Sequence, residues 1–132
     1  MVVAAMRSPA GASAAILMAA RQGLITLLMS VPLAIEYEAT CQRAAHRLAA
    51  GLSAPEVNRF LDVIVAMAEP VKPRFLWRPQ LRDPGDEMVL EAAVNGRAAL
   101  LVTFNIRHFG ATPSRFGIDV LRPGEALRRF RQ

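Results

Sequence analysis

The sequence predicts an α/β domain in which helices pack in layers on a short parallel sheet. Short apolar segments of strand length alternate with segments whose apolar residues recur at helical spacing, an order typical of layered α/β domains rather than helical bundles. The chain has 132 residues, 53% of them hydrophobic, which suits one domain over residues 1–132 with a sizeable core. Charged residues of both signs make up 20% of the chain, which argues against disorder.

The first expected helix covers Ser13–Gln22, because Ile16, Leu17 and Ala20 share one of its faces. Gly23 can adopt the left-handed conformation that ends a helix. A buried strand is then expected in the short apolar run of residues 24–29, whose centre is β-branched.

The next helix begins at Ser30, a residue type that caps helix N-termini, and Pro32 suits its first turn. We expect this helix to run to about Ala50 and to end at Gly51.

A capping box, Ser53–Glu56, starts another helix, in which the serine accepts from the glutamate amide and the glutamate reaches back. The helix is expected to end before Pro70, because a residue that precedes proline avoids the helical region. We expect a short strand near Glu69–Val71. The rest of the stretch up to Gly85 is expected to be a loop packed by its large side chains, Phe75, Leu76 and Trp77.

The second half predicts a helix over Asp86–Asn95, stopped by the glycine that follows it. Strands are expected over Ala99–Thr103 and Ile118–Leu121, and a last helix begins at Pro123. These two strands and the strand of residues 24–29 are expected to share one parallel sheet.

Charge and cysteine content narrow the function classes. The formal net charge is +5, with fifteen arginines and a single lysine, which permits a polyanionic partner without proving one. A single cysteine, Cys41, excludes an internal disulfide and a multi-cysteine metal site, as suits a cytoplasmic protein, and it is expected to be a small apolar core residue. The longest apolar run, Ala14–Ala20, is far shorter than a membrane span, so no membrane contact is expected.

Oxygen-bearing side chains stand next to the predicted strands and at a predicted helix start. They are Glu36, Glu38, Asp83, Asp86, Thr103 and Asn105. In open parallel sheets, sites form beyond the carboxyl ends of strands. Two carboxylates about 4 Å apart repel by about 4 kcal/mol at an effective dielectric near 20, and a divalent cation relieves that repulsion. Mg²⁺ or Mn²⁺ prefers such oxygen ligands and can activate an attacking water, so metal-assisted hydrolysis is the chemistry that these residues would serve.

Each of these residues also has a purely structural explanation. Asp86 at a helix start suits the helix dipole, and Asp83 before proline suits a turn. Glu36 could be a solvated helix position. His46 and His108 have no partner at a recognisable ligand spacing, and a surface or structural role is expected for His46.

The same residues carry a resemblance to PIN-domain proteins, and within them to the toxins of toxin–antitoxin modules. The segments that resemble this family are Ser30–Glu38, Asp83–Ala93, Leu101–Asn105, His108–Phe109 and Phe116–Glu125. The resemblance implies a three-layer α/β/α fold with a short parallel sheet and a ribonuclease that depends on Mg²⁺ or Mn²⁺. It assigns catalytic roles to Glu36, Asp86, Asn105 and Thr103, with Glu36, Asp86, Asp83 and Asn105 as metal ligands.

Two positions depart from the family pattern. Asn105 and His108 stand where aspartate occurs in the family, so the expected metal site carries less negative charge. The first strand of the family, which ends in a metal-binding aspartate, is also missing, and the chain begins in a segment that resembles the following helix, Val2–Pro9. Three explanations stay open: a start codon placed too far downstream, a natural remnant, or a deliberately shortened chain.

Two functions follow as expectations. The first is a metal-dependent endonuclease for single-stranded RNA, inactive or feebly active in this chain because the first aspartate is absent, with Arg82 and Arg107 meeting the RNA backbone. The alternative is a non-catalytic PIN-like module that binds RNA or an antitoxin. Without a central strand the chain should expose strand edges, so we also expect self-association into a homo-oligomer.

Overall fold

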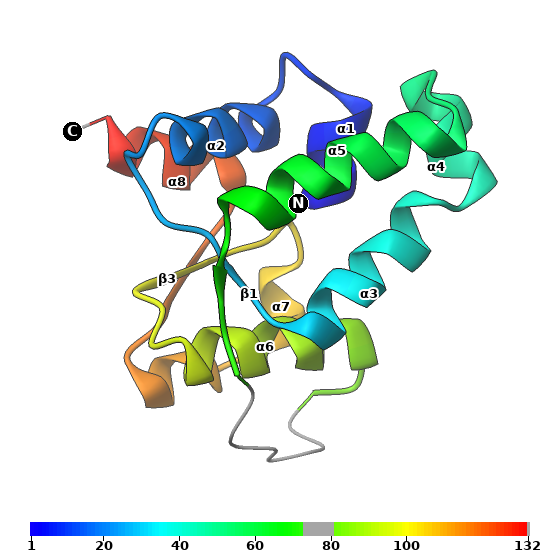
Figure 1. Ribbon diagram of the computed structural model, residues 1–132. Helices are drawn as coiled ribbons and strands as arrows, with labels where there is room; N and C mark the ends of the chain where they lie inside the picture. The colour runs from blue at the N-terminus through cyan, green and yellow to red at the C-terminus, as the bar shows by residue number, and fades with distance from the viewer. Residues whose placement is uncertain (73–80, 132) are drawn as a thin grey trace.

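The computed structural model describes residues 1–72 and 81–131, and it is a mixed α/β fold that is mostly helical, as the sequence predicted. In Figure 1 the strands cross the middle of the molecule, with α6 on one side and α1, α2 and α5 on the other. The helices of the described residues are α1 (Val2–Arg7), α2 (Ala12–Arg21), α3 (Val31–Cys41), α4 (Ala44–Ala50), α5 (Ala54–Met67), α6 (Pro84–Asn95), α7 (Ile106–Phe109) and α8 (Pro123–Phe130), with a 3₁₀ helix, η1 (Pro113–Phe116).

The strands form two separate parallel pairs. β1 (Leu28–Met29) pairs with β2 (Glu69–Pro70), and β3 (Leu100–Val102) pairs with β4 (Asp119–Leu121). The prediction of one sheet containing β1, β3 and β4 was therefore wrong for the described residues, whose strands make two two-stranded sheets. β1 and β3 do not pair, and residues 25–28 and 98–102 line a cavity of about 480 Å³.

The helix predicted after Ser30 is divided into α3 and α4, which corrects the expectation of one continuous helix. The chain becomes extended at Arg43, where ψ is 134°. The Gln42 side chain explains the break, since its Nε2 donates to Ala54 O at 3.1 Å and to Asn58 Oδ1 at 2.9 Å on α5. Arg47 Nε then donates to the Gln42 carbonyl at 3.0 Å, so the interruption leaves that acceptor satisfied.

The predicted helix starts are confirmed by their caps. Ser30 Oγ accepts from the Leu33 amide at 3.2 Å. Ser53 and Glu56 form the full capping box, with bonds of 3.3 and 3.0 Å. The short strand expected near Glu69 is β2. The aromatic loop expected to pack through Phe75, Leu76 and Trp77 lies outside the described residues.

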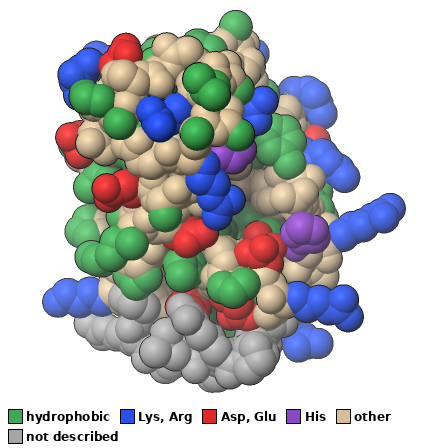
Figure 2. Space-filling view, turned by 90° about the vertical axis from the view of Figure 1, so that its right-hand side faces the viewer, with side chains coloured by type: hydrophobic (Ala, Val, Ile, Leu, Met, Phe, Trp, Pro, Cys, Tyr) green, Lys and Arg blue, Asp and Glu red, His purple; other side chains and the backbone are tan. Residues whose placement is uncertain are grey.

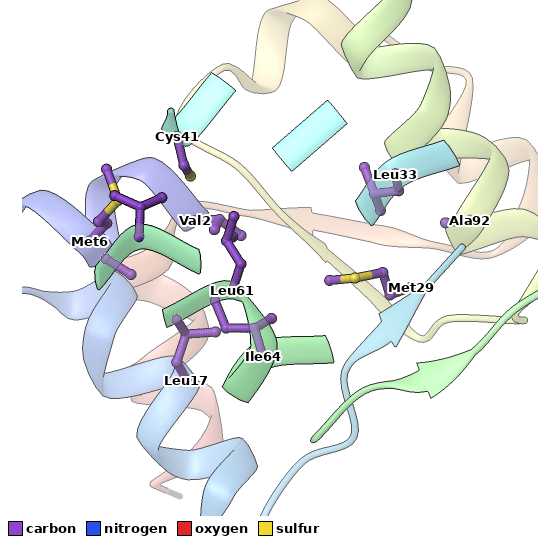
Figure 3. Close-up of a cluster of buried hydrophobic side chains, with 11 residues drawn as sticks. Val2, Met6, Leu17, Met29, Leu33, Cys41, Leu61, Ile64 and Ala92 are labelled. Carbon is purple, nitrogen blue, oxygen red and sulfur yellow. The ribbon is translucent and has the colours of Figure 1, made fainter. Parts of the chain in front are cut away.

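The larger hydrophobic cluster joins α1, α2, α3 and α5 and reaches β1 and α6. Figure 3 shows its side chains converging between these elements; those labelled are Val2, Met6, Leu17, Met29, Leu33, Cys41, Leu61, Ile64 and Ala92. Cys41 is fully buried there, and burial raises the pKa of its thiol, so it acts as the apolar core residue that the sequence predicted.

A smaller cluster lies under β3 and β4. Its buried members are Leu90, Ala93, Leu101, Phe109 and Ile118. They come from α6, β3, α7 and the residue before β4. Because α6 contributes buried residues to both clusters, it joins the two halves of the molecule.

Candidate functional site

The N-terminus of α6 positions two carboxylates. Asp83 is its N-cap, and Asp83 Oδ1 accepts from the amides of Gly85 at 2.7 Å and Asp86 at 3.1 Å. Pro84 occupies the first helical position, where its missing N–H costs no hydrogen bond. The cap fixes the first turn, so Asp86 projects from a rigid position beside Asp83. The helix thus begins two residues earlier than the sequence predicted.

Asp86 contacts a histidine that the sequence pattern did not connect with it. Asp86 Oδ2 lies 3.1 Å from His108 Nδ1, and α7 carries His108 to this position. The next residue, Phe109, is buried at 1% exposure and anchors α7 in the smaller cluster. The sequence spacing did not indicate this pair, because the two positions are 22 apart in the chain and only the fold brings them together.

The environment of Asp86 shifts the pKa of its carboxyl upward. Burial raises the pKa of the Asp86 carboxyl above its ordinary value, the neighbouring charge of Asp83 raises it further, and His108 opposes both effects. Asp83 and Asp86 are thus close enough to repel each other. Relief of such repulsion is one effect that a bound cation produces.

Glu36 approaches the same helix turn from α3. A Cβ placed on Gly85 would lie 3.4 Å from Glu36 Oε1 and 3.0 Å from Asp83 Oδ1, so both carboxylates lie against this glycine. Thr40 Oγ1 donates to Glu36 Oε1 in a long hydrogen bond of 3.5 Å. Glu38, two residues further along α3, is exposed.

Asn105 follows β3, as predicted, and Thr103, which was expected to be the last residue of the strand, lies just beyond it. The Asn105 amide donates to Thr103 Oγ1 at 3.0 Å, which makes a tight turn into α7. Asn105 is the N-cap of α7, but its side chain makes no capping hydrogen bond. Its exposed amide is therefore not used by the helix that it precedes.

Acidic and basic side chains line a cavity of about 510 Å³ beside the N-terminus of α6 and α7. Its lining includes Asp83, Asp86, His108, Arg82 and Arg107. Figure 2 shows acidic side chains beside a histidine, with basic side chains around them, on one face of the molecule. The two arginines singled out for RNA contact thus border the two aspartates. Among the described residues, those lining this cavity do not include Glu36, Thr103 or Asn105.

The donor atoms suit a hard divalent cation, because carboxylate oxygens are the ligands that Mg²⁺ and Mn²⁺ prefer. Within residues 1–72 and 81–131, however, no group of three or more His, Cys, Asp or Glu residues is placed to hold one ion together. The donor chemistry therefore fits a metal, while the preformed part of the site is the aspartate pair.

Sequence comparison agrees with this architecture. The PIN domain family matches residues 1–107, which is most of the chain. No curated protein and no solved structure matches it. The fold and the site define a class of protein. It is a domain of short parallel strands between helices, with acidic residues at one end. The chain belongs to the PIN domain family, whose members are generally nucleases that use divalent metals.

Three further findings bear on the sequence-based expectations. The family match ends at residue 107, so it does not include the resembling segment Phe116–Glu125. His46 does not line the acidic cavity, and its Nδ1 atom lies 3.4 Å from Arg7 Nη1. In the part of the chain that the structure describes, no helix has the length and apolar character needed to cross a membrane.

Proposed function

We propose that this protein is a divalent-metal-dependent endoribonuclease that cleaves single-stranded RNA, of the kind found in toxin–antitoxin modules. The observation that carries the proposal is the cavity in which Asp83 and Asp86 stand beside Arg82 and Arg107. An acidic pair that can hold a cation next to arginines that can hold phosphate is the combination that phosphodiester hydrolysis needs.

Asp86, Asp83 and Glu36 would hold the metal, with Asn105 and Thr103 beyond β3 as further oxygen donors. A bound Mg²⁺ or Mn²⁺ would polarise the phosphate and lower the pKa of a water. The arginines bind the RNA backbone through planar guanidinium groups, which suit phosphate oxygens. His108 Nδ1, 3.1 Å from Asp86 Oδ2, would orient the Asp86 carboxylate, because carboxylates that bind a metal are held by hydrogen bonds to neighbouring groups.

The test is cleavage of single-stranded RNA in the presence of Mn²⁺. Asp86→Asn should abolish cleavage while RNA binding is retained, because binding depends on arginines and phosphates. Arg107→Gln should weaken RNA binding and flatten its salt dependence. Glu38→Gln is the matched control, since Glu38 is an exposed carboxylate on the helix that carries Glu36, and it should leave cleavage unchanged. Cleavage that persists in Asp86→Asn would overturn the assignment of the site.

A second candidate function has an observation in its favour. Because the described residues hold no group of three potential metal ligands, the chain could be a non-catalytic module that binds RNA or an antitoxin. Titration with Mn²⁺, followed by relaxation of water protons, separates the two functions. Metal binding that is lost in Asp86→Asn supports the nuclease, whereas RNA binding without metal binding or cleavage supports the module.

Self-association and an antitoxin partner are part of the same proposal. The free edges of β1 and β3 support association through strands, because unpaired edges favour pairing with another chain. Sedimentation at high micromolar concentration should therefore show a species larger than a monomer.

A further inference from the structure

Phe104 is an aromatic side chain that the fold leaves at the surface. It is 51% exposed, the most exposed of the aromatic residues that the structure describes. In that part of the chain it belongs to neither hydrophobic cluster, whereas Phe109 on the following helix is 1% exposed. Single exposed apolar residues are common on protein surfaces, so the surroundings of Phe104 decide what its ring can do.

Hydrogen bonds hold the backbone on both sides of Phe104. The Thr103 amide donates to the Leu121 carbonyl at 3.0 Å, and the Asn105 amide donates to Thr103 Oγ1 at 3.0 Å. The His108 amide then donates to the Asn105 carbonyl at 3.0 Å, in the first turn of α7. A fixed turn therefore carries the ring, and little backbone freedom is lost when the ring binds a partner.

This turn leads directly into the wall of the acidic cavity. α7 begins at Ile106, and its residues Arg107 and His108 line the cavity together with Asp83 and Asp86. Arg107 is exposed and follows Phe104 within one turn of chain. An exposed ring, a guanidinium group and an acidic pair thus occur together at this end of β3.

The exposed neighbours of Phe104 are polar. Between Thr103 and His108, the exposed residues besides Phe104 are Asn105, Arg107 and His108. A surface that docks another protein usually has a continuous apolar centre with a polar rim. A single ring among hydrogen-bonding and basic groups is more typical of a surface that binds single-stranded nucleic acid.

An aromatic ring close to an arginine is complementary to an unpaired nucleotide. The flat face of a base stacks on the ring, and the phosphate backbone pairs with the guanidinium group. Every base has such a face, so this contact requires no particular sequence. In a duplex, neighbouring bases cover the faces of each base, so the same ring would have no base to stack on.

We propose that Phe104 stacks on one unpaired base of a single-stranded RNA whose phosphate backbone pairs with Arg107. This assignment rests on the proposed function, because the acidic cavity marks where the strand would be cleaved. It adds a structural reason for a preference for single strands over duplexes. Phe104 holds the base and takes no part in the chemistry at the phosphate.

The first experiment measures binding in EDTA, so that no strand is cleaved. The probes are an oligoadenylate RNA of about ten nucleotides and an abasic oligomer with the same sugar–phosphate backbone. Phe104→Ala should weaken binding of the oligoadenylate by about tenfold and change binding of the abasic oligomer by less than about twofold. Arg107→Gln should weaken binding of both oligomers by the same factor, because both carry the phosphates. Equal losses for the two oligomers in Phe104→Ala, or no loss for either, would overturn the proposal.

Conservative variants separate stacking from simple apolar contact. Phe104→Tyr keeps an aromatic face and should bind the oligoadenylate as the wild type does. Phe104→Leu keeps an apolar side chain without that face and should lose most of the affinity that Phe104→Ala loses. Phe116→Ala removes a ring that is 42% exposed on η1, and it should leave binding of both oligomers unchanged. Wild-type affinity in Phe104→Leu would show apolar contact only and would contradict stacking.

Two further measurements separate this proposal from the nuclease and from a protein contact. If the wild type cleaves single-stranded RNA with Mn²⁺ while Phe104→Ala binds the oligoadenylate unchanged, the stacking proposal fails and the nuclease proposal stands. Base-dependent binding through Phe104 in a chain that does not cleave supports stacking and overturns the nuclease. If Phe104→Ala alters sedimentation of the protein but not its binding of RNA, the ring contacts a protein and the stacking proposal fails.

Discussion

The two hydrophobic clusters of this molecule differ in size and in what they support. Among the described residues, the larger one is enclosed by α1, α2, α3 and α5 and contains eleven buried residues. In the same part of the chain the smaller one contains five, which come from α6, β3, α7 and the residue before β4. Buried apolar area is the main stabilising contribution to folding. The stability of the smaller half therefore depends more on each of its buried side chains.

The candidate site spans the boundary between these two halves. Glu36 comes from α3, in the larger half, and the aspartates come from α6, which both halves share. His108 comes from α7, whose anchor Phe109 belongs to the smaller half. The site geometry therefore depends on how firmly the smaller half is packed, even though most of the core lies elsewhere.

The largest effect on the free energy of unfolding is expected from Phe109→Ala. Removing this buried ring should lower the free energy of unfolding by about 3–5 kcal/mol, since a large cavity is left in a small cluster. It should also release α7 and separate His108 from Asp86. Leu61→Ala, in the larger cluster, is the comparison and should cost about 2–5 kcal/mol without moving His108.

Urea unfolding monitored by circular dichroism measures both costs, and the chemical shifts of the His108 ring report its contact with Asp86. If Phe109→Ala left those shifts unchanged, the smaller cluster would not be what positions the histidine.

The sequence predicted local structure well wherever the signal was local. The caps of Ser30 and Ser53 were recognisable because the bonded atoms lie within three residues of each other. The break between α3 and α4 was not predictable, since it depends on Gln42 reaching Asn58 on another helix. The separation of the two sheets was also hidden, because strand sequences show burial but not which edges meet.

The site shows the same division. The sequence placed Asp86 near a helix start and Thr103 near a strand end, each within two residues of the position in the structure. The contact between Asp86 and His108 did not, because it requires α7 to pack under α6. Whether Glu36 and Asn105 share one metal with the aspartates stays a prediction.

Gly96 and Gly51 were both expected to end helices. In the structure, each position requires a glycine for a different reason. Gly51 has φ of 70° with open space around it, whereas Gly96 has φ of −85°. A Cβ on Gly96 would lie 2.8 Å from Leu28 Cδ1 and 2.9 Å from Val71 Cγ2. Gly96→Ala should therefore cost about 1–3 kcal/mol through overpacking where α6 meets the first sheet.

A double-mutant cycle tests that reason. Adding Leu28→Ala should recover part of the loss caused by Gly96→Ala, because it removes the nearest clashing atom. Gly51→Ala should show no such recovery with Leu28→Ala, since its cost is backbone strain at a distant site. Additive effects at Gly96 would contradict the steric explanation.

The smallest effect on the free energy of unfolding is expected from Asp86→Asn, and this effect depends on pH. In the folded protein the pKa of Asp86 is raised above its ordinary value of 3.8, first by burial and then by the charge of Asp83. Folding therefore favours the protonated carboxyl, and the wild type loses stability as pH rises from about 3.8 through the raised folded pKa. The loss persists at neutral pH.

Asparagine removes the charge, so the variant should be slightly more stable than the wild type at pH 7 and equal to it at pH 3. Thermal unfolding at both pH values measures the difference, with the exposed Asp62→Asn on α5 as control. A variant less stable than the wild type at pH 7 would mean that attraction to His108 outweighs burial and repulsion. Together with the expected loss of RNA cleavage, a stabilising Asp86→Asn would show that the carboxylate is kept at the seam of the two halves for its chemistry, at a cost in stability.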